Sequence, residues 1–343
     1  MNKVKIISDP IANMPWQDKP EGLVNAPVWR YTENPIIKRN PFRGVARIFN
    51  SAVMYYGKDD IPYIGVFRGE RVNGLPYIYL GKSQDGLAWT FDEKGIEFVN
   101  EDGKPATPEC PFDPRLLKID GVYYIIWCHS DYGSAVGVAR TTDFKTFTRL
   151  DDPFLPYNRN AVLFPKKING NYVMLSRPSD STHTRFGDIF LSESPDLTYW
   201  GKHKFVMGKG RLWWEDLKIG GGPAPIETSE GWLVFYHGVQ GSCNGFVYSM
   251  GGVILDKDNP SVVKYRCESF LLTPEDWYET CGNTPNVCFP CATLHDPDTG
   301  RIAIYYGAAD TYVAVAFTQV DEIVAYIKEY NVLQAGDGDT GVK

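Results

Sequence analysis

Several features of other protein classes are missing from this 343-residue sequence. It contains no run of basic residues, its net charge is −7 and its pI is near 5.4. Nucleic-acid-binding proteins hold phosphates with clustered Lys and Arg, so we expect no nucleic-acid partner. No apolar stretch approaches the length of about eighteen residues that a membrane-spanning helix needs, so we expect no membrane association.

The first twenty residues lack the pattern of a secretory leader. Their apolar stretch is only a few residues long and is followed by Asp9 and Pro10. The seven cysteines are odd in number and do not form the framework of a small secreted domain, so we expect them to be reduced. These observations predict a cytoplasmic protein.

Metal and nucleotide motifs are also scarce. Cys288 and Cys291 have CxxC spacing, but only His295 lies close by and no second pair completes four zinc ligands. We favour small buried side chains on a strand over a metal site there. The sequence has no GxSxG motif, and GGGP at residues 220–223 leads into a strand, not a phosphate-binding helix. We therefore predict no metal and no cofactor.

Helical periodicity is scarce as well. Only residues 321–330 (DEIVAYIKEY) place apolar residues at i, i+3 and i+4, which predicts one helix. Aromatic residues make up 14% of the chain, and 33 glycines and 24 prolines accompany them. This composition favours short strands joined by turns.

A hairpin pattern recurs along the chain. Four copies carry a turn glycine followed by an aromatic and β-branched strand, at Gly121, Gly170, Gly231 and Gly300. In a fifth, looser copy residues 58–60 (KDD) replace the glycine turn. Each hairpin is followed by a strand of small residues and usually by a polar turn, which predicts third and fourth strands. In the last copy we assign these two strands to residues 313–323 (VAVAFTQVDEI).

Five units of four strands predict an all-β fold, a five-bladed β-propeller with a short C-terminal helix. We expect a single domain over residues 1–343, with an N-terminal extension of about 28 residues and a frayed tail from about residue 332. A pair of β-sandwiches is the alternative fold. In a propeller the inner strands converge on a central channel, so polar residues at their ends should share one cavity.

Polar residues at the ends of the expected inner strands are the candidates for chemistry. Asp113 precedes Pro114 at the entrance to one strand, where it either faces the channel or caps a turn. A convergent set of basic and polar side chains would clamp a phosphate or a carboxylate, whereas any single cation could form a surface ion pair. This set is Arg68, Arg159, Arg177, Lys218, His237 and Tyr248. Three carboxylates, Asp180, Asp188 and Asp310, could pair with these cations or bind sugar hydroxyls.

Longer motifs that contain these residues resemble glycoside hydrolase family 130, whose members are mostly β-mannoside phosphorylases. The resemblance covers most of the chain through WRYTENPI, IFNSAV, FDPRL, PYNRN, PKKINGNYVMLSRPSD, FGDIFLSESPD, YHG, SCNGFVYSMG, NVCFPCA and IYYGAADT. It implies a five-bladed propeller with its active site in the central cavity.

The resemblance also implies roles for individual residues. Asp113 corresponds to the catalytic acid, which protonates the glycosidic oxygen indirectly through the 3-hydroxyl of the mannose. The cationic set, with His237 and Tyr248, corresponds to the phosphate site. The implied substrate-binding residues are Asn50, Ser51, Phe112, Asn158, Asn160, Asp180, His183, Arg185 and Asp310.

The implied activity is that of an inverting β-D-mannoside phosphorylase. Phosphate is a co-substrate that cleaves a manno-oligosaccharide and gives α-D-mannose 1-phosphate. Hydrolysis by a β-mannosidase of the same family is the alternative, but hydrolytic members lose the basic set that this chain keeps. A silent sugar-binding propeller would be expected to lose Asp113 or several cations. Family members are often oligomeric, so the resemblance includes a homo-oligomer among the expected states.

Two departures from the family pattern bear on the linkage. Members that act on β-1,4-mannosides usually have Tyr before the catalytic Asp and a segment like RPSDNGHTPFGDI. This chain has Phe112 there and RPSDSTHTRFGDI, with changes at Ser181, Thr182 and Arg185. These positions resemble those that contact the acceptor sugar, so both β-1,2 and β-1,4 linkages stay open, with a slight preference for β-1,2.

Overall fold

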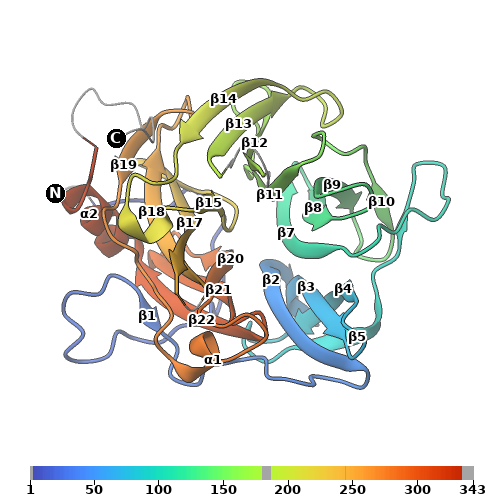
Figure 1. Cartoon of the computed structure of the whole chain (residues 1–343), viewed down its shortest axis with the longest axis horizontal. Coiled ribbons are helices and arrows are strands. Elements are labelled where there is room, and N and C mark those ends of the chain that lie inside the picture. The colour runs from blue at the N-terminus through green and yellow to red at the C-terminus, as the bar shows by residue number, and fades with distance from the viewer. Residues whose placement is uncertain (1–2, 180–186, 244, 334–343) are drawn as a thin grey trace.

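The computed structural model of the chain describes residues 3–179, 187–243 and 245–333. Five sheets, antiparallel except at one edge strand, surround a central axis, so the predicted five-bladed propeller is confirmed (Figure 1). Asp180, His183 and Arg185, together with Ser181 and Thr182, lie outside the described residues.

The first three blades follow one another in chain order, and their strands run outward from the axis. Blade 1 contains β2 (Val45–Lys58), β3 (Ile61–Arg71), β4 (Pro76–Ser83) and β5 (Thr90–Gly95). Blade 2 contains β7 (Phe112–Ile119), β8 (Val122–His129), β9 (Ala135–Thr141) and β10 (Phe147–Arg149), with the short parallel strand β6 (Phe98–Val99) at its edge. Blade 3 contains β11 (Asn158–Leu163), β12 (Tyr172–Pro178), β13 (Ile189–Ser194) and β14 (Gly201–Met207).

The last two blades are less regular. In blade 4 the inner strand is interrupted, so that β15 (Lys218–Gly221) and β16 (Ile226–Thr228) both pair with β17 (Gly231–Ser242), followed by β18 (Gly245–Leu255) and β19 (Val263–Arg266). The short helices η1 (Trp213–Glu215) and α1 (Trp277–Thr280) precede β15 and blade 5. Blade 5 contains β20 (Cys288–His295), β21 (Arg301–Ala308), β22 (Tyr312–Gln319) and β1 (Trp29–Arg30).

Local sequence explains the repeated turns. Asp120 and Gly121 have φ values of 49° and 83°, and Asn169 and Gly170 have values of 51° and 82°. Two consecutive positive φ values are those of the type I′ turn, whose twist matches that of a hairpin and which favours Asn or Asp before Gly. The turns at Gly121 and Gly170 are therefore hairpin turns of this type, and Gly231 and Gly300 also have positive φ values of 130° and 71°.

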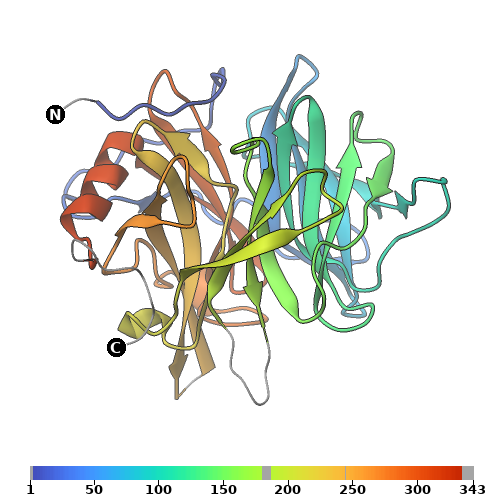
Figure 2. The same cartoon turned by 90° about the horizontal axis from the view of Figure 1, so that it is seen from above.

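One sequence assignment in blade 5 is wrong. Residues 313–323 were expected to supply a third and a fourth strand, but α2 (Val320–Glu329) begins directly after β22. The outer strand is instead β1 from the N-terminal region, in which Trp29 pairs with Phe317. A strand from the start of the chain thus completes the last sheet and closes the ring. The predicted helix is confirmed, and it packs on the outside of blades 4 and 5 (Figures 1 and 2).

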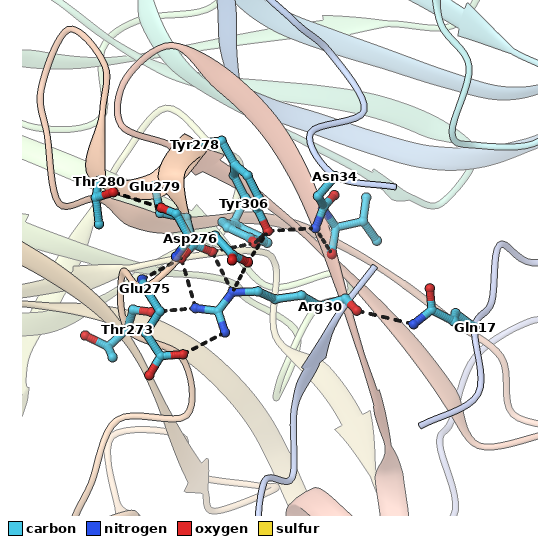
Figure 3. A network of polar contacts seen from close by, with 11 residues as sticks. Gln17, Arg30, Asn34, Thr273, Glu275, Asp276, Tyr278, Glu279, Thr280 and Tyr306 are labelled. Carbon is cyan, nitrogen blue, oxygen red and sulfur yellow. Dashed lines mark hydrogen bonds and ion pairs between the residues drawn. The ribbon is translucent and has the colours of Figure 1, made fainter. Parts of the chain in front are cut away.

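Arg30 fastens the closing strand to the body of blade 5 (Figure 3). Its guanidinium donates to both oxygens of Glu279, at 2.8 and 2.9 Å, and to the carbonyl oxygen of Thr273 at 2.6 Å. Glu279 is fully buried and also accepts a hydrogen bond from the Tyr306 hydroxyl. Burial works against the charge of Arg30, but Glu279 outweighs it and raises the pKa of Arg30. The buried charges of Arg30 and Glu279 thus stabilise each other.

The chain shows no membrane-spanning helix: among the described residues, none of the helices is both long and apolar enough to cross a bilayer.

Replacing Arg30 by Met should lower the free energy of unfolding by about 3 to 5 kcal/mol, because a buried carboxylate would lose its cation. The exposed pair of Lys82 and Asp92 is the matched control, and Lys82→Met should cost less than about 1 kcal/mol. Urea denaturation followed by tryptophan fluorescence measures both. Equal losses would remove Arg30 from its role in ring closure.

Candidate active site

Irregularities in the inner strands turn side chains toward the channel. The pairing register shifts between Phe49 and Ser51, between Phe112 and Arg115, and between Arg159 and Val162. The residues at these bulges, Asn50, Asp113 and Asn160, have φ values of 49°, 52° and 51°. Asn and Asp tolerate this left-handed conformation better than other residues with a side chain, and a bulge re-aims the side chain that it carries. The site is therefore built from equivalent points of neighbouring blades.

A cavity of about 370 Å³ lies at this end of the channel. Seven predicted site residues line it: Asn50, Arg68, Phe112, Asp113, Arg159, Tyr248 and Asp310. Four residues that were not predicted line it as well: Ser130, Thr284, Val287 and Phe289. The blades thus bring together residues that lie far apart in the sequence.

Asp113 lies at the centre of one side of the cavity. One of its oxygens, Oδ1, accepts hydrogen bonds from Asn50 Nδ2 at 2.7 Å and from Arg68 Nη1 at 2.9 Å. Arg68 also donates to Glu70 at 2.6 Å, so its charge is shared between two carboxylates. The carboxyl group of Asp113 is thereby fixed in orientation.

The two carboxyl groups in this cavity differ in their acidity. Burial by itself would raise the pKa of Asp113, but the charge of Arg68, the hydrogen bond from Asn50 and the charge of Arg115 lower it. For Asp310, burial outweighs the opposing effects of Arg68 and Thr284, and the pKa is raised. Asp113 is therefore ionised in the free protein at neutral pH, and Asp310 retains its proton to higher pH.

Positive charge is concentrated beside the cavity, where Arg177, Lys218 and His237 lie next to the lining residues Arg159 and Tyr248 without lining the cavity themselves. Arg177 Nη1 lies 3.1 Å from His237 Nε2. A guanidinium can only donate, so Nε2 accepts and the His237 ring is neutral. Burial, together with the charges of Arg177 and Lys218, holds the pKa of His237 well below its ordinary value. Lys218 and His237 both face the Tyr248 ring, and the Lys218 ammonium lies 5.4 Å from its centroid.

The cations of this cluster lack a neutralising partner in the part of the chain that the structure describes. In the described part of the chain, no carboxylate forms an ion pair with Arg159, Arg177 or Lys218. Burial lowers the pKa of Arg177 to about 10; Tyr248 opposes this effect, and the charge of Arg159 adds to it. Burial and the charges of Arg177 and Arg159 lower the pKa of Lys218 to about 8. Such a cluster is suited to an anion that arrives from solution.

Phe112 lies close to two arginines that line the cavity. Its ring centroid lies 5.4 Å from the Arg68 guanidinium and 5.8 Å from that of Arg159. Arg159 also donates to the Ser134 hydroxyl. The ring thus lies between the two guanidinium groups.

The other predicted residues do not line this cavity, and each occupies a position beside or away from it. Ser51 is buried, and its hydroxyl has no hydrogen-bond partner. Asn158 accepts a hydrogen bond from the Arg159 backbone, and the Asn160 backbone N–H donates to Cys128 Sγ. Asp188 binds the Lys209 backbone N–H and pairs with none of the clustered cations.

Sequence reasoning missed several contacts of the site. Glu70 follows Arg68 by two residues on β3, so the alternation of side chains along a strand could have placed them on one face. Ser134 and Arg115 had no such signal, because their partners come from other strands and other blades.

Cys288 and Cys291 lie on β20 and are buried. Burial raises the pKa of both thiols, to about 12 for Cys291. Within residues 3–179, 187–243 and 245–333, no group of three His, Cys, Asp or Glu side chains could hold a metal ion.

Comparison with known proteins places this site in a family. The family described as beta-1,4-mannooligosaccharide phosphorylase matches residues 10–329. The chain therefore belongs to glycoside hydrolase family 130, as the sequence motifs predicted.

Relatives within the family act on different linkages. The chain is 52% identical over 328 residues to a beta-1,4-mannooligosaccharide phosphorylase from Ruminococcus albus, covering 94% of this chain and 96% of the relative. It is 33% identical to a 1,2-beta-oligomannan phosphorylase from a Thermoanaerobacter species, covering 81% and 92%. The solved beta-1,2-mannobiose phosphorylase from Listeria innocua superposes with a TM-score of 0.77 at 26% identity, covering 88% and 99%.

The unpaired cations should reduce the stability of the free protein. The pKa of Lys218 is about 8 when folded and 10.5 ordinarily, so the unfolded chain binds the proton more tightly. This penalty is fully present below pH 8 and fades as the pH rises toward 10.5. Lys218→Met should therefore stabilise the fold at pH 7 by about 1 to 2 kcal/mol in phosphate-free buffer.

Thermal and urea unfolding at pH 7 measure this effect. Lys204, an exposed lysine 3.6 Å from Glu193, provides the control, and Lys204→Met should change stability little. A destabilised Lys218→Met variant would show that the ammonium is already compensated.

Proposed function

We propose that this protein is an inverting β-mannoside phosphorylase that cleaves manno-oligosaccharides with inorganic phosphate and releases α-D-mannose 1-phosphate. The observation that carries the proposal is the cluster of Arg159, Arg177 and Lys218, which has no carboxylate partner in the described part of the chain. Arg159 lines the same cavity as Asp113, and Arg177 and Lys218 lie close enough to Arg159 to feel its charge. Phosphate acts as a co-substrate, and no cofactor is required. The proposed location is the cytoplasm.

The cationic side of the cavity supplies the nucleophile site. Arg159, Arg177 and Lys218 bind the phosphate dianion, and Tyr248 adds its hydroxyl. His237 accepts from Arg177 and so holds that guanidinium in place. Phosphate is already a competent nucleophile, so the protein needs to orient it for in-line attack on an oxocarbenium-like carbon and needs no base.

Asp113 supplies the proton for the leaving group. The free carboxyl is ionised, because Arg68, Asn50 and Arg115 lower its pKa. A phosphate dianion beside Arg159 adds negative charge close to Asp113, which raises its pKa and favours the protonated form. Binding of the nucleophile thus prepares the acid.

Hydrolysis is the second candidate, because the cavity and its surroundings hold two further carboxyl groups. A hydrolase needs a carboxylate to activate water. Glu70 is engaged by Arg47 and Arg68, so it is not free to act as that base. The raised pKa of Asp310 would suit a base, but a hydrolase has no use for the clustered cations Arg159, Arg177 and Lys218. Phosphorolysis is therefore favoured.

For the linkage, we propose β-1,4-mannosides as the first substrates and β-1,2-mannosides as the second. Phe112 and Arg185 led to a slight preference for β-1,2, whereas the 52% identity to a beta-1,4-mannooligosaccharide phosphorylase weighs toward β-1,4. Both linkages stay within the proposed function. Asn50, Ser51 and Asp310 are proposed to bind the mannose, and Phe112 the acceptor.

Purified protein incubated with β-1,4-mannobiose and phosphate should yield mannose and α-mannose 1-phosphate, identified by NMR of the anomeric proton and phosphorus. The parallel reaction with β-1,2-mannobiose assigns the linkage. Cleavage that proceeds equally fast in phosphate-free buffer would identify a hydrolase instead.

Replacing Asp113 by Asn should reduce kcat by about 10²- to 10⁴-fold, because the leaving group would lose its proton donor. The change is nearly isosteric, so the melting temperature should stay close to that of the wild type. Asp188→Asn is the control, since that carboxylate lies outside the cavity. An active Asp113→Asn variant would transfer the acid role to another group.

A further inference from the structure

Arg115 connects two blades across the channel. It lies on β7, two residues after Asp113, and its side chain is buried, with the residue only 2% exposed. Its Nε donates to the carbonyl oxygen of Gly222 at 2.5 Å, and its Nη1 donates to that of Pro114 at 3.0 Å. A longer contact of 3.4 Å reaches the carbonyl oxygen of Asp113. One guanidinium thus joins the backbone of blade 2 to that of blade 4.

Both points that Arg115 joins are irregular. Asp113 occupies the bulge of β7, and Gly222 lies in the gap between β15 and β16. A side chain at Gly222 would approach the Phe235 carbonyl oxygen to 2.6 Å, so glycine is needed there. The interrupted strand therefore has a backbone carbonyl available for a side chain from the facing blade.

The backbone of Asp113 needs an external constraint. Its φ of 52° is left-handed, and the following Pro114 disfavours helical conformations of the residue before it. Residues in such conformations persist only where their surroundings impose them. Arg115 binds the carbonyl groups of both residues and provides that constraint.

Packing alone does not explain a guanidinium at this position. The hydrogen-bond acceptors of Arg115 are carbonyl oxygens, and in the described part of the chain no carboxylate forms an ion pair with it. Its buried Nη2 has no hydrogen-bond partner among the described residues, and Arg115 also lines a second cavity of about 490 Å³. A protein with apolar residues in place of buried charges of similar volume is often equally stable. The presence of this charge therefore indicates a role other than stabilising the fold.

We propose that Arg115 is a positioning residue that holds the peptide of Asp113 at a fixed distance from the phosphate side of the cavity. Gly222 directly follows β15, which carries Lys218 and pairs with the His237 segment of β17. The hydrogen bond from Arg115 to Gly222 therefore sets the position of the Asp113 carboxyl group relative to the proposed phosphate site. This inference rests on the proposed acid role of Asp113.

The charge of Arg115 has a second effect. It is one of the groups that lower the pKa of Asp113, after Arg68 and Asn50. Removal of that charge should raise the pKa of Asp113, and the decline in rate on the alkaline side should move to higher pH. Lysine keeps the charge but cannot reach both carbonyl groups with a planar fork. The effect on the position of Asp113 can therefore be separated from the effect on its pKa.

The experiment compares Arg115→Lys with Arg115→Gln in phosphorolysis of the same mannobiose. Arg115→Lys should lower kcat by about 100-fold, because a displacement of about 1 Å at a catalytic group has that effect. Its KM for phosphate and its pH profile should match those of the wild type. Arg115→Gln should lower kcat by a similar factor, and its decline in rate on the alkaline side should move to higher pH.

Arg266→Lys is the matched control. Arg266 is another fully buried arginine, but it lies on β19, the outer strand of blade 4. This variant should melt at a lower temperature while keeping kcat and the pH profile. Rates are divided by the folded fraction, which is taken from melting curves.

Three results would overturn the inference: wild-type kcat in both Arg115 variants, a loss carried mainly by KM for phosphate, or variants that fail to fold. Asp113→Asn in the same assay separates this inference from the proposed function. If that variant is active, the acid role fails. If it is inactive while Arg115→Lys behaves as wild type, only the role of Arg115 fails.

Discussion

The bulges of the inner strands are the constraint on which the rest of the site depends. In regular strands the side chains would alternate between the faces of each sheet and pack against neighbouring blades. Because Asn50, Asp113 and Asn160 leave the regular conformation at equivalent points, Asn50, Asp113 and the neighbouring Arg159 reach one cavity. The hydrogen bonds of Asn50 to Asp113 and of Arg115 to Gly222 then join one blade to another.

Charge is distributed unequally across the cavity. On the side of Asp113, Arg68 is balanced by two carboxylates, whereas Arg159, Arg177 and Lys218 repel one another in the neighbouring cluster. The ion pairs of Arg68 fix the side chain of Asp113, and the three clustered cations favour the binding of an anion. A site that binds a dianion and transfers a sugar to it benefits from both, at the expense of stability in the free protein.

The extent to which the sequence predicts this protein depends on the range of the interactions. Turn glycines such as Gly121 and Gly170 act locally, and the repeat that they mark predicts the blades. Strand β1 was not assigned to blade 5, because its partner is nearly three hundred residues away and two residues carry no periodicity. The sequence identifies the individual cations as candidates. Their convergence depends on the closed ring of blades, and their specific roles came from the family motifs. Glu70, Ser134 and Arg115 act on other site residues and have no motif of their own.

Ring closure has a consequence for how the protein folds. Trp29 and Phe317 pair across almost the whole chain, and the cavity takes Asn50 from the first blade and Asp310 from the last. Such distant contacts form late, because the entropy of closing a long loop opposes them. A growing polypeptide can therefore complete its early blades on the ribosome without assembling the cavity. The cavity is complete only when the two ends of the ring meet.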